Sequence, residues 1–129
     1  QLEPYNFKSV LFEINLSKNR LKKIKINMNK LERLFVNFNY LTSIDDLTFQ
    51  NMNNLKRLSI SNNRIEAISL KAFEKMINLN YFSLSSNSLK TLSSKQFQNN
   101  KQLNRIILSF NKISELEYKA FLGLEDSIQ

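Results

Sequence analysis

Apolar and polar residues follow a pattern that returns every 20 to 24 residues along this chain. In segment 79–102, apolar residues occupy the first, fourth, sixth, eleventh and fourteenth places, an asparagine the ninth and a phenylalanine the nineteenth. Segments 31–54, 55–78 and 103–126 repeat this pattern, and 11–30 is a shorter copy without the phenylalanine. Self-similarity at a fixed period of this length indicates an array of structural repeats.

Each repeat is predicted to contain one short strand, because the residues around its fourth and sixth places alternate in polarity. In a strand, side chains alternate between the two sides with a period of two residues, so the fourth and sixth places both face the core. Strands of successive repeats would pair in parallel, with right-handed crossovers between them. The pattern therefore predicts a right-handed solenoid with parallel strands on its concave side, at 13–17, 33–37, 57–61, 81–85 and 105–109.

The convex side is expected to consist of irregular or short helical turns, which makes the predicted fold class an α/β solenoid. Segments 70–74 and 94–98 contain neither Gly nor Pro and tolerate a helical turn. Repeat 11–30 is too short for one, so we expect a tight extended crossing with Ile26 and Met28 turned inward. The phenylalanines are expected to stack as a spine, at positions 49, 73, 97 and 121.

The repeated residues resemble the leucine-rich repeat pattern L-x-x-L-x-L-x-x-N-x-L. The period of 24 residues with a phenylalanine at the nineteenth place is similar to the extracellular "typical" subfamily, which includes Toll-type receptors and secreted immune proteins of insects. The resemblance covers residues 11–126. It implies a leucine-rich repeat superhelix in a secreted or extracellular receptor or effector of innate immunity that recognises a protein partner.

The ninth-place asparagines are interpreted as a structural ladder. An asparagine side chain offers both an acceptor and two donors. Just after a strand the chain turns, and backbone groups there lose their ladder partners, which the asparagine can replace. Leaving such buried groups unpaired would cost about 1–3 kcal/mol each. The predicted ladder is Asn19, Asn39, Asn63, Asn87 and Asn111.

The concave face is the predicted partner-binding surface. Its third places form a row rich in Arg and Tyr, types that are enriched in binding hot spots. Ser and Asn fill most fifth and seventh places of this face, but apolar residues occupy some of them. Further aromatic residues lie beside Arg33. The alternative is that these apolar and aromatic residues are ordinary single exposed side chains. The predicted binding residues are Arg33, Phe35, Phe38, Tyr40, Arg57, Tyr81, Arg105 and Ile107.

The chemistry of the chain argues against an enzyme. Cys and His are absent, which removes disulfides, thiolate metal sites, a Cys nucleophile and the commonest general base. One Gly rules out a Gly-rich phosphate loop. Asp45 and Asp46 are adjacent in an outer loop and would not converge on one reacting atom. No cofactor and no metal site is predicted.

The net charge of +8 leaves a second function open, the binding of a polyanion such as a glycan or a nucleic acid. The basic residues, mostly Lys, appear evenly scattered, with no run typical of a nucleic-acid-binding arm. A third alternative is a scaffold segment without a ligand. Asn15-Leu16-Ser17 is the only glycosylation sequon, which makes Asn15 a candidate acceptor in a secreted, glycoprotein context.

The chain is expected to form a single domain, residues 1–129, with 1–10 as a partial repeat or cap. Both ends lack a recognisable cap, so we expect a fragment of a longer array or self-association through the ends. No apolar run is long enough for a transmembrane helix.

Overall fold

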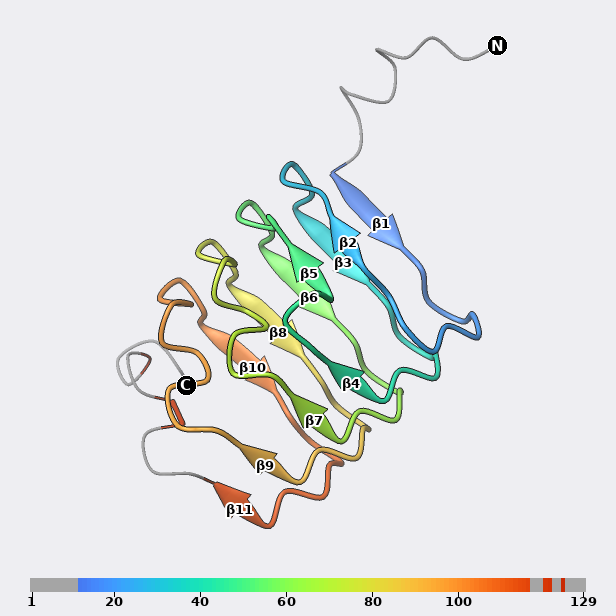
Figure 1. Ribbon diagram of the computed structural model, residues 1–129, viewed down its shortest axis with the longest axis vertical. Coiled ribbons are helices and arrows are strands. Elements are labelled where there is room, and N and C mark those ends of the chain that lie inside the picture. Colours follow the sequence, from blue (N-terminus) through green and yellow to red (C-terminus); the bar gives the residue numbers. More distant parts are fainter. Residues whose placement is uncertain (1–11, 117–119, 122–123, 125–129) are drawn as a thin grey trace, which may run out of the picture.

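The computed structural model describes residues 12–116, 120, 121 and 124, and its backbone winds as a solenoid whose turns follow the sequence repeats (Figure 1). The expected cap or partial repeat at 1–10 lies outside the described residues. Five short strands pair in parallel in the order β1-β3-β6-β8-β10. They are β1 (Glu13–Asn15), β3 (Arg33–Phe35), β6 (Arg57–Ser59), β8 (Tyr81–Ser83) and β10 (Arg105–Ile107).

In the register of this sheet, equivalent positions of successive repeats lie opposite one another. Leu34 lies opposite Ile14 on one side and opposite Leu58 on the other. The predicted parallel strands are therefore confirmed, although each strand is shorter than the predicted segment.

The return segments contain shorter strands that pair two by two. One pair joins β4 (Ser43–Ile44) to β7 (Ala67–Ile68), and another joins β9 (Thr91–Leu92) to β11 (Glu115–Leu116). The third joins β2 (Ile26–Asn27) to β5 (Phe49–Gln50). Ile26 is buried and Met28 packs half-buried against the core, which confirms the extended crossing expected in the first repeat.

Of the irregular or short helical turns expected on the convex side, the helical alternative is wrong and the irregular one holds, because no helix occurs in the part of the chain that the structure describes. Segment 70–74 instead forms successive turns, in which Ala72 N–H donates to the Ser69 carbonyl and Glu74 N–H to that of Lys71. In segment 94–98, Lys95 adopts a left-handed φ of 60°, which no α-helix accommodates. Segments this short also gain too few bonds to offset helix nucleation. Among the described residues, the solenoid is built from strands and turns.

In the core, side chains from equivalent positions of successive repeats stack between the five-stranded sheet and the return segments. The first-place leucines Leu31, Leu55, Leu79 and Leu103 are all fully buried. The predicted phenylalanine spine is confirmed by three stacked contacts, with ring centroids 6.4 Å apart for Phe49–Phe73, 6.1 Å for Phe73–Phe97 and 6.0 Å for Phe97–Phe121.

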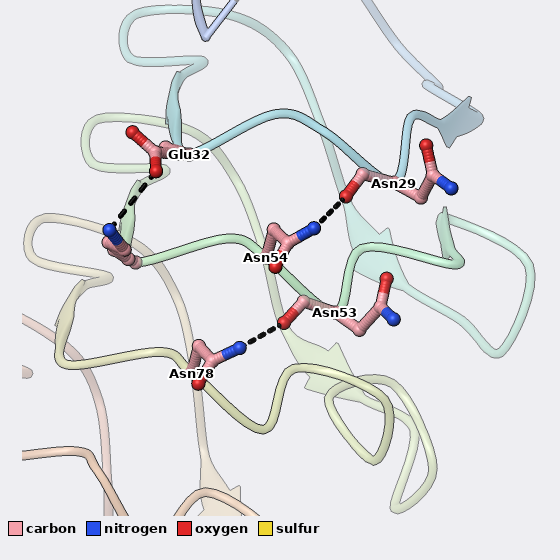
Figure 2. A network of polar contacts seen from close by, with 6 residues as sticks. Asn29, Glu32, Asn53, Asn54 and Asn78 are labelled. Carbon is pink, nitrogen blue, oxygen red and sulfur yellow. Dashed lines mark hydrogen bonds and ion pairs between the residues drawn. The ribbon is translucent and has the colours of Figure 1, made fainter.

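Exposed asparagines also tie neighbouring repeats together at the side where the chain enters the strands. Figure 2 shows the Asn54 amide donating to the Asn29 carbonyl at 2.6 Å, and the Asn78 amide donating to the Asn53 carbonyl at 2.7 Å. These bonds fix the spacing of the outer turns from one repeat to the next.

Candidate interaction surfaces

The outward side chains of the five-stranded sheet form a surface that we call the sheet face, and its third-place row is continuous. In that row Arg33 pairs with Arg57, and Tyr81 pairs with both Arg57 and Arg105. Neighbouring members therefore lie on adjacent strands, about 4.8 Å apart.

Two contacts order this row. The Arg33 guanidinium bonds to the Glu13 carboxylate at 3.1 Å. The Arg57 guanidinium lies over the Tyr81 ring, 4.4 Å from its centroid. The three arginines are exposed and Tyr81 is half-buried. The row thus presents cations whose orientation is already restricted by their neighbours.

The centre of the sheet face is lined by short polar residues. The fifth-place serines Ser59 and Ser83 belong to this face but are largely covered by their neighbours, with exposures of 8% and 3%. The Ser59 hydroxyl donates to the Asn37 amide oxygen at 2.7 Å, and the Ser61 and Ser83 hydroxyls are 2.8 Å apart. These serines are buried because their side chains are short and form hydrogen bonds across the strands. Their row continues to half-buried Phe35 at one side and half-buried Ile107 at the other.

Phe38 and Tyr40 lie away from this face, in the turn that follows β3. Phe38 adopts a left-handed φ of 56°, and the eighth-place residues of the other repeats do the same, with φ between 54° and 60° for Lys18, Asn62, Ser86 and Phe110. The eight predicted binding residues are thus divided between two surfaces.

The eighth and tenth places form two rows along these turns, and we call this surface the turn flank. Backbone bonds between repeats hold both rows: Phe38 N–H donates to the Ser61 carbonyl at 3.0 Å, and Arg64 N–H to the Leu41 carbonyl at 2.8 Å. The eighth-place row is Lys18, Phe38, Asn62, Ser86 and Phe110, and the tenth-place row is Arg20, Tyr40, Arg64, Ser88 and Lys112.

A basic cluster that the sequence pattern concealed includes two members of the turn flank, Lys18 and Arg20. Residues 14–31 hold no acidic residue, and their cations are Lys18, Arg20, Lys22, Lys23, Lys25 and Lys30. The expectation of evenly scattered charge overlooked this cluster because apolar residues separate its members. Adding up the charges of each repeat would have found it, because repeat 11–30 carries six cations against one acidic residue, Glu13. All six cations are exposed.

The asparagines behind the turns bond across repeats. The Asn63 oxygen accepts the Leu41 N–H at 3.1 Å, and its amide donates to the carbonyls of Val36 at 2.9 Å and Ile60 at 3.4 Å. Asn39, Asn87 and Asn111 repeat this arrangement. Asn39, Asn63 and Asn87 are buried and Asn111 is half-buried. Asn19 is exposed, and its bonds to described residues lie within its own repeat.

The paired aspartates have turn-forming contacts. The pKa of Asp45 lies below its ordinary value, because its carboxylate accepts hydrogen bonds from the Leu47 N–H and the Thr48 hydroxyl, and Lys23 adds a favourable charge. Asp46 bonds to the Ser69 hydroxyl. Neither contact resembles a catalytic pair.

The predicted glycosylation acceptor, Asn15, is exposed on β1, and its side-chain oxygen accepts the Ser17 N–H at 3.0 Å. In the ranges described, no group of His, Cys, Asp or Glu could hold a metal ion. No helix of the described chain is long and apolar enough to cross a membrane.

Comparisons with known proteins agree with this architecture. The family model described as leucine rich repeat matches residues 29–89 and 77–126. No curated protein matches the chain. The chain is similar to a chain of the crystal structure of the TLR13-ssRNA13 complex, with 29% identity and a TM-score of 0.82. That match covers 89% of this chain and 17% of the other.

Two structures of the Toll–Spatzle complex of Drosophila are also similar. The glycosylated form matches at 26% identity with a TM-score of 0.68, covering 80% of this chain and 16% of that chain. The other matches at 23% identity with a TM-score of 0.62, covering 81% and 16%, and shows the fold alone. This chain therefore spans about one sixth of the length of the solved chains it matches.

Proposed function

We propose that this chain, which belongs to the leucine-rich repeat family, is a non-catalytic recognition module that binds a protein partner through its sheet face. The observation that carries the proposal is the row of Arg33, Arg57, Tyr81 and Arg105 on adjacent strands. Arginine supplies planar donors that match carboxylates in bidentate fashion, and Tyr supplies an amphipathic ring.

The rigidity of the sheet face supports this proposal. The ion pair of Arg33 and the stacking of Arg57 on Tyr81 restrict these side chains before a partner arrives. Immobilising a flexible side chain costs about 0.5–1.5 kcal/mol on association, and a side chain that is already ordered loses less. Half-buried Phe35 and Ile107 add apolar contact area at the two sides of the central serines.

The similarity to Toll in its complex with Spatzle supports a protein partner and an extracellular role in innate immunity, as receptor or effector. Within this proposal the five repeats act as one right-handed, concave domain. The partner would carry acidic residues opposite the arginine row.

Replacing Arg57 or Tyr81 by Ala is expected to weaken partner binding by about 2 kcal/mol, since each change also removes the stacking that orders the other residue. A binder selected from a displayed protein library against the immobilised chain supplies the ligand for calorimetry. Lys71→Ala and Lys95→Ala, exposed on the return side, serve as controls and should bind as the parent does. A ranking in which the control variants lose affinity and the Arg57 and Tyr81 variants keep it would contradict the proposal.

Asn15 is proposed as a glycosylation acceptor of the secreted protein, because it is exposed within its sequon. Expression through the secretory pathway is expected to give a mass that falls on treatment with an N-glycosidase, and Asn15→Gln should abolish that difference. An untreated mass equal to that of the unmodified chain would reject the proposal.

A second candidate function is polyanion binding. The exposed cations in residues 14–31 favour it, as does the similarity to the structure of TLR13 with ssRNA13. These cations lie outside the third-place row of the sheet face, so the two candidates can be separated by mutation.

A further inference from the structure

The turn flank combines exposed cations with exposed aromatic rings. Phe38, Tyr40 and Phe110 are 53%, 38% and 84% exposed. Both phenylalanines occupy left-handed turns, a conformation that costs a residue with a side chain roughly 1–2 kcal/mol. Neither burial nor backbone preference accounts for a phenylalanine there, which suggests that the rings contact something else.

Tyr40 lies between two cations in its row, and Phe38 lies beside one. In the tenth-place row Tyr40 stands between Arg20 and Arg64, and the Arg64 guanidinium lies over its ring, 4.6 Å from the centroid. In the eighth-place row Phe38 follows Lys18, whose N–H donates to the Asn37 carbonyl at 2.9 Å. Successive members follow the repeat spacing of the solenoid, about 4.8 Å between adjacent strands.

The positive charge of this surface is poorly compensated. Lys18, Arg20 and Lys22 form no ion pair with any described residue. The ion pairs of the described chain join other residues: Arg33–Glu13, Lys56–Glu32 and Lys90–Glu66. Lys23 is partly balanced by Asp45, whose carboxylate its charge influences. Residues 14–31 carry six of the cations and none of the anions of a chain whose net charge is +8.

We propose that the turn flank, together with Lys22 two residues beyond Arg20 in the sequence, binds a single-stranded nucleic acid, with Lys18, Arg20 and Lys22 on the phosphates and with Tyr40 and Phe38 stacking on bases. Such ligands combine a linear series of negative charges with unpaired planar bases, and proteins bind them through cations and aromatic platforms. A duplex keeps its bases stacked inside, and an acidic polypeptide offers charge without bases. The inference rests on the polyanion candidate and is independent of the sheet face.

The test is fluorescence anisotropy of the full chain with a labelled oligothymidylate, the same sequence in a duplex, and polyglutamate of equal charge. We expect the single strand to bind most tightly. Tyr40→Ala and Phe38→Ala should each weaken its binding about fivefold or more, because stacking on each base is lost. Tyr40→Phe, which keeps the ring, should bind as the parent does.

The salt dependence separates charge from stacking. Lys22→Ala should reduce the slope of log affinity against log salt by about 0.7, the value for one phosphate contact on a single strand, whereas Tyr40→Ala should leave the slope unchanged. Thermal melting of each variant confirms that it is folded.

Control variants on the sheet face, Arg57→Ala and Arg105→Ala, should not change oligonucleotide binding. Equal affinity for duplex or polyglutamate, or unchanged binding by Tyr40→Ala, would overturn the proposal and leave a general attraction between charges. Loss of oligonucleotide binding in the Arg57 variant alone would also overturn it, because the ligand would then lie on the sheet face. A selected protein binder that depends on Arg57 would stand in either case, so the two proposals can fail separately.

Discussion

Phe73→Ala is expected to lower the free energy of unfolding by about 3–5 kcal/mol, the range for truncating a buried phenylalanine. Phe73 is fully buried and lies between Phe49 and Phe97 in the spine, with Phe82 tilted against it at 4.9 Å. Its removal opens a cavity that the stacked rings on both sides cannot close, since each is held by its own repeat. Urea denaturation followed by circular dichroism measures the change.

Leu70→Ala is the matched control for this prediction. Leu70 lies three residues before Phe73 in the same turn and is 49% exposed, so its truncation should change stability by no more than about 0.5 kcal/mol. A similar loss in both variants would mean that the turn as a whole, and not the spine, limits stability.

Asn63→Ala is expected to destabilise the chain by about 1–3 kcal/mol for each buried backbone group that loses its partner. The Leu41 N–H has its bond to the Asn63 oxygen at 3.1 Å, and the Val36 carbonyl receives the amide at 2.9 Å. Both groups belong to the preceding repeat, so the substitution also loosens the contact between repeats. Denaturant melts measure the effect, and the slope of the transition reports whether unfolding stays cooperative.

Asn19→Ala provides the comparison at the same place of another repeat. Asn19 is exposed, and its bonds to described residues lie within its own repeat, so water can replace its side chain and the loss should stay near the net value of about 1 kcal/mol for one hydrogen bond. Equal losses for Asn19→Ala and Asn63→Ala would show that bonding between repeats does not set the cost.

The architecture was largely predictable because it follows from periodicity. The spacing of Leu31, Leu55 and Leu79 determines which residues are buried, and the spacing of Phe49, Phe73 and Phe97 determines which rings stack. The convex turns were less predictable, because helix propensity is a weak preference that a residue such as Lys95 with positive φ overrides.

The candidate surfaces were predicted only in part. Strand alternation assigned Arg57 and Tyr81 to one row, which the register bears out. The same alternation placed Ser83 at the surface, although cross-strand hydrogen bonding buries it. Phe38 does not lie on the sheet face, because a left-handed turn begins just after the strand. The sequence did not indicate that turn, since no glycine occurs there.

The order β1-β3-β6-β8-β10 also has a kinetic consequence. Each strand of this sheet pairs only with those of the repeats before and after it, so every pairing step closes a loop of one repeat length. The entropy of loop closure grows slowly with length, about 0.6 kcal/mol per doubling, and here no pairing requires a longer loop. Folding can therefore begin at any pair of repeats and spread by equal steps. An array extended with further repeats of this kind would gain stability without a slower rate-limiting closure.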